Sequence, residues 1–211
     1  MHPARLSLAA AAARSWLAGP LLLAVLLSPP VETLAEQSLV VHHFAHWLMV
    51  VAGALAGYQL RNLVRLPAAA VVAWAGLGAA LLWHLPPLLS WAEGSRVTHM
   101  FAHATLVAGG GALGWGVPRL SGPSKAYLFI TANVIMWPLV LAEIAGAFTY
   151  SQYPGQESQA GVAELVAMTL SWFVLGFWTK ISALFSRPLV SIIAQAGLAT
   201  LALAGWVLPR S

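Results

Sequence analysis

The chain has 211 residues, of which 60% are apolar and 8% are charged, and its formal net charge is +4. No soluble domain of this length needs so much apolar surface, so the composition excludes a soluble globular fold and predicts a polytopic membrane protein. The chain has no cysteine, which excludes disulfides and thiolate metal ligands.

An α-helix that crosses a bilayer needs about 20 mostly apolar residues. By that measure the sequence predicts an all-α fold, with residues 1–211 forming a single transmembrane domain of about seven helices. In chain order the predicted spans cover residues 8–28, 38–60, 67–84, 97–117, 126–149, 162–180 and 188–208.

The first predicted span has two interpretations. Arg5 and Arg14, followed by the apolar run 15–27, resemble a signal peptide that would be cleaved. The run ends in a pair of prolines, just as the third span does. That parallel favours a retained first helix.

Basic residues predict the orientation of the chain, because they gather on the cytoplasmic side of a membrane. Eight of them fall on one side of the predicted spans, and these are Arg5, Arg14, Arg61, Arg65, Arg119, Lys125, Lys180 and Arg187. The N-terminus is therefore expected inside and the C-terminus outside. The same asymmetry explains the isoelectric point near 10.0, so no nucleic-acid partner is predicted.

One stretch of the chain occurs twice. Residues 29–57 and 86–114 align without a gap at an offset of 57, and 13 of the 29 aligned positions are identical. Each copy begins with two prolines and ends with a G-x-x-x-G run, which lets helices approach closely. The pattern predicts an internal parallel repeat of two helices, with both copies in the same orientation.

Each copy carries one H-x-x-x-H motif: His42 and His46 in the first, His99 and His103 in the second. Residues four apart share one face of a helix, so the members of each pair are expected to point together. If the copies pack about a local pseudo-twofold axis, the pairs face each other. Four imidazoles are enough to hold a metal ion, and we take these histidines as its core ligands.

Other polar residues are predicted at the same outer depth. His84 ends the third span and is the next candidate ligand, while Glu164 and Met168, four residues apart in the sixth span, are additional candidates. Glu143 is expected to orient an imidazole from outside the ligand set. His43 points about 100° away from His42 on the helix and is the weaker candidate. Ionisable residues inside a bilayer are costly and usually line functional cavities.

The residue types narrow the choice of ion. Imidazole suits zinc, copper, iron and nickel, whereas a thioether favours Cu(I). Met49, Met100 and Met168 lie in the same zone of the sequence, which favours copper and leaves zinc as the alternative. Two other interpretations of these histidines stay open. One is a haem held by one histidine from each copy, and the other is a structural or proton-handling network without a metal.

Three motifs in this order and spacing resemble the CtaG-type cytochrome c oxidase assembly factors: His42-x-x-x-His46, Trp83-His84-Leu85-Pro86 and His99-x-x-x-His103. The resemblance covers residues 38–175. It implies a multi-pass protein of the bacterial inner (cytoplasmic) membrane. Such a protein would assist copper insertion into a membrane metalloenzyme client such as cytochrome c oxidase.

The sequence also departs from that family. Its members are usually longer, an acidic residue often stands where this chain has Ala102, and the segment 156–161 lacks the usual Asp-Gln run. A related archaeal-type family of unknown function shares the general pattern and fits equally well.

Two other functions stay open beside the assembly factor. A seven-helix zinc hydrolase of lipid amide bonds would use three histidines and an activated water. Because the chain has no aspartate, Glu164 or Glu143 would have to be its general base. A haem-binding or metal-binding subunit of a membrane oxidoreductase is the other. No nucleophile motif is present, so no catalytic residue is assigned, and the segment 150–161 is expected to be a plain solvated turn.

Overall fold

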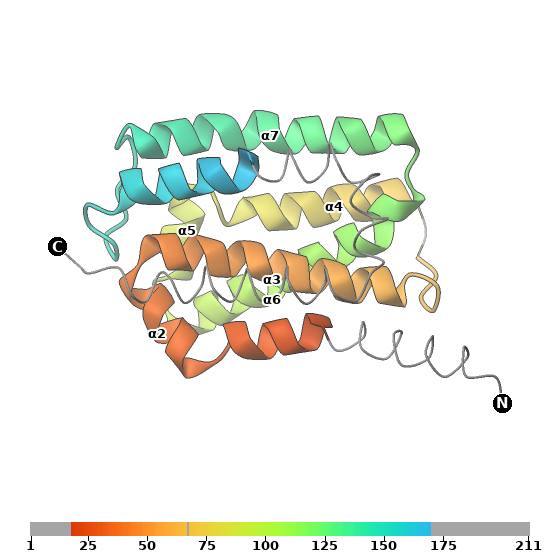
Figure 1. Cartoon of the computed structure of the whole chain (residues 1–211), viewed down its shortest axis with the longest axis horizontal. Helices are drawn as coiled ribbons and strands as arrows, with labels where there is room; N and C mark the ends of the chain where they lie inside the picture. The colour runs from red at the N-terminus through yellow and green to blue at the C-terminus, as the bar shows by residue number, and fades with distance from the viewer. Residues whose placement is uncertain (1–17, 67, 170–211) are drawn as a thin grey trace, which may run out of the picture. The chain divides into compact units, whose positions relative to one another are not determined.

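The computed structural model describes residues 18–66 and 68–169, and within these ranges the chain is helical and contains no strand. The chain divides into two compact units, Met1–Leu165 and Val166–Ser211, and every contact below lies in the first. In chain order (Figure 1) the elements are a helix Ala18–Leu26, α2 Pro29–Gln37, α3 Leu39–Leu60, α4 Ala69–Leu82, α5 Pro86–Ala92, α6 Arg96–Gly116, the 3-10 turn η1 Val117–Arg119, α7 Gly122–Ile144 and a helix from residue 157 to the last described residue, 169.

The helices α3 and α7 are each long and apolar enough to cross a membrane. Two bent pairs meet the same criteria jointly: Ala18–Leu26 with α2, bent by 57°, and α4 with α5, bent by 75°. These apolar helices identify a membrane protein with two candidate spans in the described ranges, or four if each bent pair is one span.

The predicted spans correspond to these helices unevenly. Those at 38–60 and 126–149 correspond to α3 and α7, and the one at 67–84 passes only as part of a bent pair. The one at 97–117 forms α6, which is not among the candidates. The last predicted span, 188–208, and the first 17 residues lie outside the described residues.

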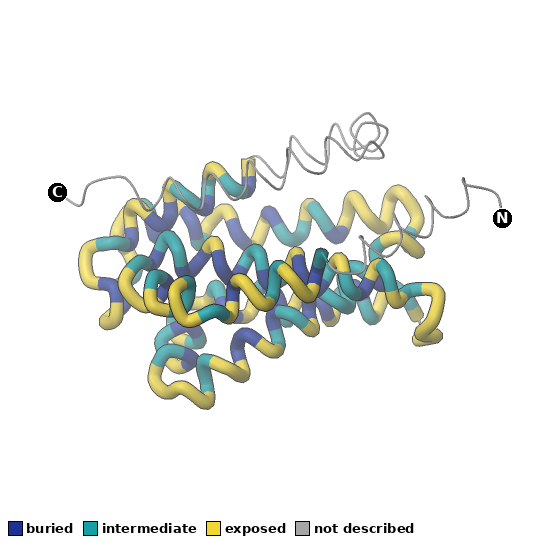
Figure 2. Tube along the Cα trace, turned by 60° about the horizontal axis from the view of Figure 1, so that its bottom comes forward, coloured by how far each residue is buried: buried dark blue, intermediate teal, exposed yellow. Residues whose placement is uncertain are grey.

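The long helices have exposed residues along their outer faces (Figure 2), and many of these residues have large apolar side chains. On α7, Val134 is 65% exposed and Leu141 is 50% exposed. Soluble monomers rarely expose large continuous apolar patches. The outward face of α7 therefore suits contact with lipid.

The two copies of the aligned stretch begin and cap their helices in the same way. The proline pairs stand at the first positions of α2 and α5, where a missing N–H leaves no hydrogen bond unmade. Ser38 caps α3 by accepting a hydrogen bond from Val41 N, and Ser95 caps α6 by accepting one from Thr98 N. Such caps stabilise a helix by about 1 kcal/mol. Both short helices lie at the same end of the long ones (Figure 1).

α3 and α6 run in parallel and touch backbone to backbone through glycines. A Cβ atom on Gly53 would collide with the carbonyl of Val107, and one on Gly110 would collide with the carbonyl of Val50. The two contacts are equivalent under the offset of 57, because Gly110 aligns with Gly53 and Val107 aligns with Val50. Equivalent residues of the two helices therefore stand at the same height.

A second pair of contacts repeats this relation one turn later. Gly57 meets the carbonyl of Gly111, and Gly114 meets the carbonyl of Ala54. The G-x-x-x-G runs of the two helices therefore interlock reciprocally, which is a packing that membrane helices favour. The histidine pairs lie toward the N-terminal ends of the same two helices.

The opposite ends of α3 and α6 carry basic residues. The guanidinium of Arg119 donates to the carbonyl of Arg61 and, at 2.7 Å, to that of Trp115. The indole of Trp115 donates to the carbonyl of Val64 at 2.9 Å. Histidines and arginines thus occupy opposite ends of the α3–α6 pair.

α7 ends next to one of the buried carboxylates. Gly146 adopts a positive φ of 69° and its N–H donates to the carbonyl of Glu143, while the N–H of Ala147 donates to that of Ala142. This Schellman arrangement ends the helix at Ile144, the residue after Glu143. The chain then returns through residues 145–156 to the helix that begins at residue 157.

Gly161 lets that helix pack closely on α7. A Cβ atom there would lie 2.9 Å from the backbone nitrogen of Ile144 and 3.1 Å from the carbonyl of Val140. Glu164 follows three residues later in the same helix and is buried.

Candidate metal centre

Four imidazoles from α3 and α6 lie close together near the N-terminal ends of these helices. The ring centroids are 4.2 Å apart for His42 and His46, and 4.1 Å apart for His99 and His103. Between the helices, His46 and His103 are 5.4 Å apart and His42 and His99 are 6.0 Å apart. We call these residues the four-histidine cluster. Their rings face each other because the glycine contacts hold α3 and α6 at the same height.

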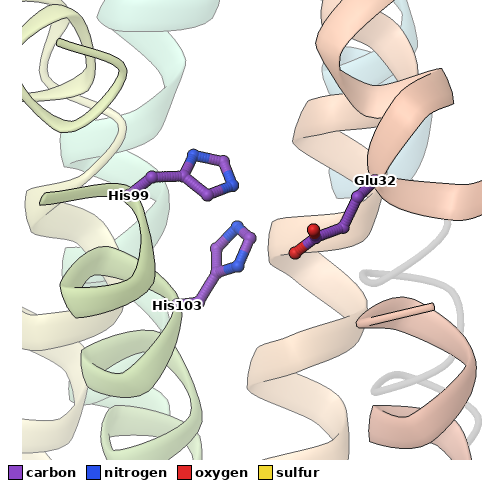
Figure 3. Close-up of side chains that lie close together, drawn as sticks. All are labelled: Glu32, His99 and His103. Carbon is purple, nitrogen blue, oxygen red and sulfur yellow. The ribbon is translucent and has the colours of Figure 1, made fainter. Parts of the chain in front are cut away.

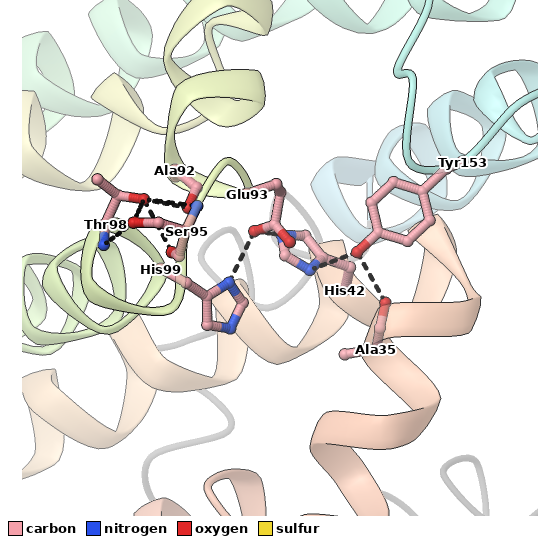
Figure 4. A network of polar contacts seen from close by, with 8 residues as sticks. All are labelled: Ala35, His42, Ala92, Glu93, Ser95, Thr98, His99 and Tyr153. Atoms are coloured by element: carbon pink, nitrogen blue, oxygen red, sulfur yellow. Dashed lines mark hydrogen bonds and ion pairs between the residues drawn. The ribbon is translucent and has the colours of Figure 1, made fainter.

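Hydrogen bonds fix which ring nitrogen of His42 carries a proton. The Tyr153 hydroxyl donates to the carbonyl of Ala35 at 2.9 Å and lies 3.2 Å from Nδ1 of His42 (Figure 4). Burial raises the pKa of the Tyr153 phenol, so it keeps its single proton. Because that proton goes to Ala35, Nδ1–H of His42 must donate to the hydroxyl oxygen, and Nε2 keeps its lone pair.

Glu93 orients His99 in the same manner. It directly follows α5, and its Oε1 accepts a hydrogen bond from Nδ1 of His99 at 2.8 Å (Figure 4). A carboxylate that holds one ring nitrogen and leaves the other free is the usual support of a metal-binding histidine. The same oxygen lies 3.6 Å from Nε2 of His42, so Glu93 reaches both helices.

Glu32 of α2 faces the second histidine pair. Figure 3 shows its carboxylate pointing toward the rings of His99 and His103. Ligand atoms of these three residues lie within 4.8 Å of one another, close enough to share an ion after small side-chain rotations. The His99 side chain is 19% exposed, so this side of the cluster is open. Within the described residues, buried Nε2 of His46 and Nδ1 of His103 have no hydrogen-bond partner.

A second group of polar side chains lies on a different face of α3. His43 points away from α6, and its Nδ1 lies 2.9 Å from Oε1 of Glu164. Nε2 of His84 lies 3.7 Å from the same oxygen. Glu143 completes the group, with ligand atoms of His43, Glu143 and Glu164 all within 4.8 Å of one another. We call these four residues the carboxylate cluster.

The segment after α7 is not the solvated turn that its composition indicated. Tyr150 and Tyr153 are 3% and 1% exposed. Oε1 of Gln156 accepts the N–H of Leu39 at 2.9 Å, and its Nε2 donates to the carbonyl of Gln37 at 3.1 Å. The segment therefore closes over the start of α3, beside the four-histidine cluster.

The structure separates the residues that the sequence had grouped into one site. His42, His46, His99 and His103 come together, whereas His84, Glu164, Glu143 and His43 form the other cluster. Met168 belongs to the second compact unit and is not placed relative to the histidines. Among the other methionines of that zone, Met49 is buried and Met100 is exposed. Met49 is therefore the one methionine of the three that still favours copper at this cluster.

Three residues beside the four-histidine cluster were not predicted: Glu32, Glu93 and Tyr153. The sequence held a signal for one of them, because Glu93 is identical between the two copies. Its equivalent, Glu36, is exposed, so the repeat did not show which glutamate would be used. Tyr153 and Glu32 carry no local pattern that marks them.

Fold and site together define a helical membrane protein with two buried clusters of histidine and glutamate. The family model of a protein of unknown function (DUF1404) matches residues 17–179, and the chain belongs to this family. Neither the search of curated proteins nor that of solved structures found a match.

Proposed function

We propose that this protein binds a transition-metal ion in the four-histidine cluster and passes it to a membrane metalloenzyme as an assembly factor. One observation carries the proposal. The clustered imidazoles of His42 and His99 each donate from Nδ1 to a fixed oxygen, so their Nε2 lone pairs are free to bind a metal. A purely structural histidine network would be expected to use both nitrogens of each ring.

Copper is the first candidate for the ion. Imidazole ligands suit copper, zinc, iron and nickel, and a thioether would favour Cu(I). Met49 lies three residues after His46 on α3 and is 1% exposed, so its sulfur is held in the interior near this level. Zinc is the alternative ion, since four nitrogen ligands suit it equally.

The open side of the cluster supports transfer rather than permanent storage. Glu32 and His99 are only half-buried, while His42 and His46 behind them are 1% and 2% exposed. An ion held by the inner pair can therefore be reached from the side of α2. This gradient of burial suits an exchangeable ion.

The topology belongs to the same proposal. With about seven spans and the N-terminus inside, Arg61 and Arg119 face the cytoplasm and the histidines face outward. The interlocked α3–α6 pair fits an internal parallel repeat. We place the protein in the bacterial inner membrane with an oxidase such as cytochrome c oxidase as its client. That choice rests on the resemblance to the CtaG-type factors.

A second candidate is a zinc-dependent membrane hydrolase, favoured by the buried carboxylates Glu143 and Glu164. Each is 3–4% exposed and lies beside histidines, so either is placed to accept a proton from a metal-bound water.

The test is elemental analysis of the purified, detergent-solubilised protein, with a visible spectrum of the same sample. Copper without a Soret band, lost in His46→Ala, supports the assembly factor. Loss of copper from the oxidase in a deletion strain, restored by the wild-type gene, would support the client. Zinc with amide hydrolysis supports the hydrolase, and a Soret band or no metal after loading overturns the proposal.

A further inference from the structure

The carboxylate cluster contains two buried carboxylates, Glu143 and Glu164, beside two histidines. Within the described residues, the ion pairs of Glu164 are with His43 and His84, and none involves Lys or Arg. Glu143 is 3% exposed, and its Oε1 has no hydrogen-bond partner there. Buried carboxylates without a compensating charge are strongly destabilising.

Protons alone do not give the polar atoms of the carboxylate cluster a full set of hydrogen bonds. Nδ1 of His84 lies 3.1 Å from the carbonyl of Ala80, which can only accept, so Nδ1 carries the proton. Nε2 of His84 then holds a lone pair, and it points at Oε1 of Glu164 from 3.7 Å. Two lone pairs that face each other in the interior repel unless a cation lies between them.

The distances fit an ion of small radius. Ligands bound at about 2.0–2.2 Å around a tetrahedral ion are roughly 3.4 Å from one another. The two distances to Oε1 of Glu164, 2.9 Å from His43 and 3.7 Å from His84, lie on either side of that value. Ligand atoms of His43, Glu143 and Glu164 all lie within 4.8 Å of one another, and His84 joins this group through its distance to Glu164.

We propose that His43, His84, Glu143 and Glu164 form a second metal site, distinct from the four-histidine cluster, for a divalent cation such as Zn²⁺, Fe²⁺ or Mn²⁺. Two imidazoles with two carboxylates suit these ions, and the set offers no thioether for Cu(I). The inference goes beyond the proposed function and does not depend on which ion occupies the first cluster.

The second ion is expected to exchange slowly. All four side chains are at most 7% exposed, and the indole of Trp47 packs edge-on against His84 with ring centroids 5.7 Å apart. Release therefore requires local opening of the packed helices. In the four-histidine cluster His99 is only half-buried, so an ion there can leave without such opening. One chain would then combine a firmly held ion with an exchangeable one.

Zinc loading of purified full-length variants tests this directly. The double variant His46→Ala/His103→Ala weakens the four-histidine cluster, and it is expected to keep about one Zn²⁺ per chain after dialysis. Adding Glu164→Gln or His84→Ala should lower that content at least about tenfold. Adding Glu36→Gln, which removes an exposed carboxylate of α2, should leave it unchanged.

Two independent comparisons separate this proposal from the first. Equal metal content in the wild type and the double variant would count against the four-histidine cluster only. A double variant that stays helical and monodisperse but binds no Zn²⁺, or that keeps its Zn²⁺ after Glu164→Gln, overturns the second site.

Co²⁺ provides a readout that does not require variants. The wild type should bind two Co²⁺ ions, one removed quickly by EDTA and one at least about tenfold more slowly. A single fast phase with one bound ion would contradict a second, buried site.

Discussion

Nδ1 of His42 lies 3.2 Å from the hydroxyl of Tyr153, a residue 111 positions later in the chain. The contact holds His42 in the tautomer that directs its Nε2 lone pair toward the other histidines. Replacing Tyr153 by Phe removes the acceptor and keeps the ring. We expect metal affinity of the four-histidine cluster to fall about 10–100-fold, as it does when an outer partner of a metal-binding histidine is lost.

Tyr127→Phe is the matched control, because Tyr127 is 67% exposed on α7. Competitive titration with a chromophoric chelator measures both variants against the wild type. Unchanged affinity in Tyr153→Phe would mean that the hydroxyl serves packing alone.

The two histidine pairs predict a second result. His46→Ala and His103→Ala should each lower the copper content of the purified protein sharply, by roughly tenfold or more, because each removes a ring from the centre of the four-histidine cluster. His2→Ala, which alters a histidine remote in sequence from every motif, should not. Elemental analysis measures all three, and equal retention would remove the metal assignment from this cluster.

The sequence predicted the four-histidine cluster well because its information is local. The four-residue spacing places two rings on one face, and the offset of 57 places the second pair at the same height. The bounds of α3 and α6 lie within one residue of the predicted 38–60 and 97–117. Helical periodicity and an internal repeat are sufficient for both results.

The carboxylate cluster could not be predicted in the same way. His43 was ranked low because it lies off the face of His42, but that other face meets α7 and the helix that begins at residue 157. Which elements pack there depends on contacts such as that of Gly161 with Ile144, 17 positions earlier in the chain. Nothing in the local pattern shows such a contact. Tyr153 was missed for the same reason.

Acid should empty the four-histidine cluster. A metal ion binds the unprotonated nitrogen, so protons compete with it for each Nε2. Occupancy is therefore full where the imidazoles are neutral and decreases as the pH falls through the ordinary titration range of histidine, around pH 6.5. Dialysis at about pH 5 and pH 7.5, followed by elemental analysis, checks the direction. Helicity by circular dichroism at each pH distinguishes release from unfolding, and full retention in acid would argue against imidazole ligands.

The close glycine contacts between α3 and α6 should contribute to the stability of the fold. Gly57→Ala and Gly114→Ala each place a methyl group against a facing carbonyl, which forces the helices apart. We expect a loss of about 1–3 kcal/mol in the free energy of unfolding, typical of overpacking. Gly78→Ala on α4 meets no atom within 4 Å and should be neutral or slightly stabilising, because alanine favours a helix. Thermal unfolding in detergent compares the three, and equal melting temperatures would show that the helices separate at little cost.

The orientation of the histidine end can be tested by labelling introduced cysteines. The chain has no native cysteine, so it gives no background labelling. Ser151→Cys introduces a thiol in the exposed part of the segment after α7, and Asn62→Cys introduces one just after α3, at the arginine end. With the histidines facing outward, a membrane-impermeant maleimide added to intact cells should label Ser151→Cys. It should label Asn62→Cys only after the membrane is opened, because Arg61 and its basic neighbours are expected in the cytoplasm. The reverse pattern would place the metal centre on the cytoplasmic side, where an ion for an exported copper enzyme would have to cross the membrane before delivery.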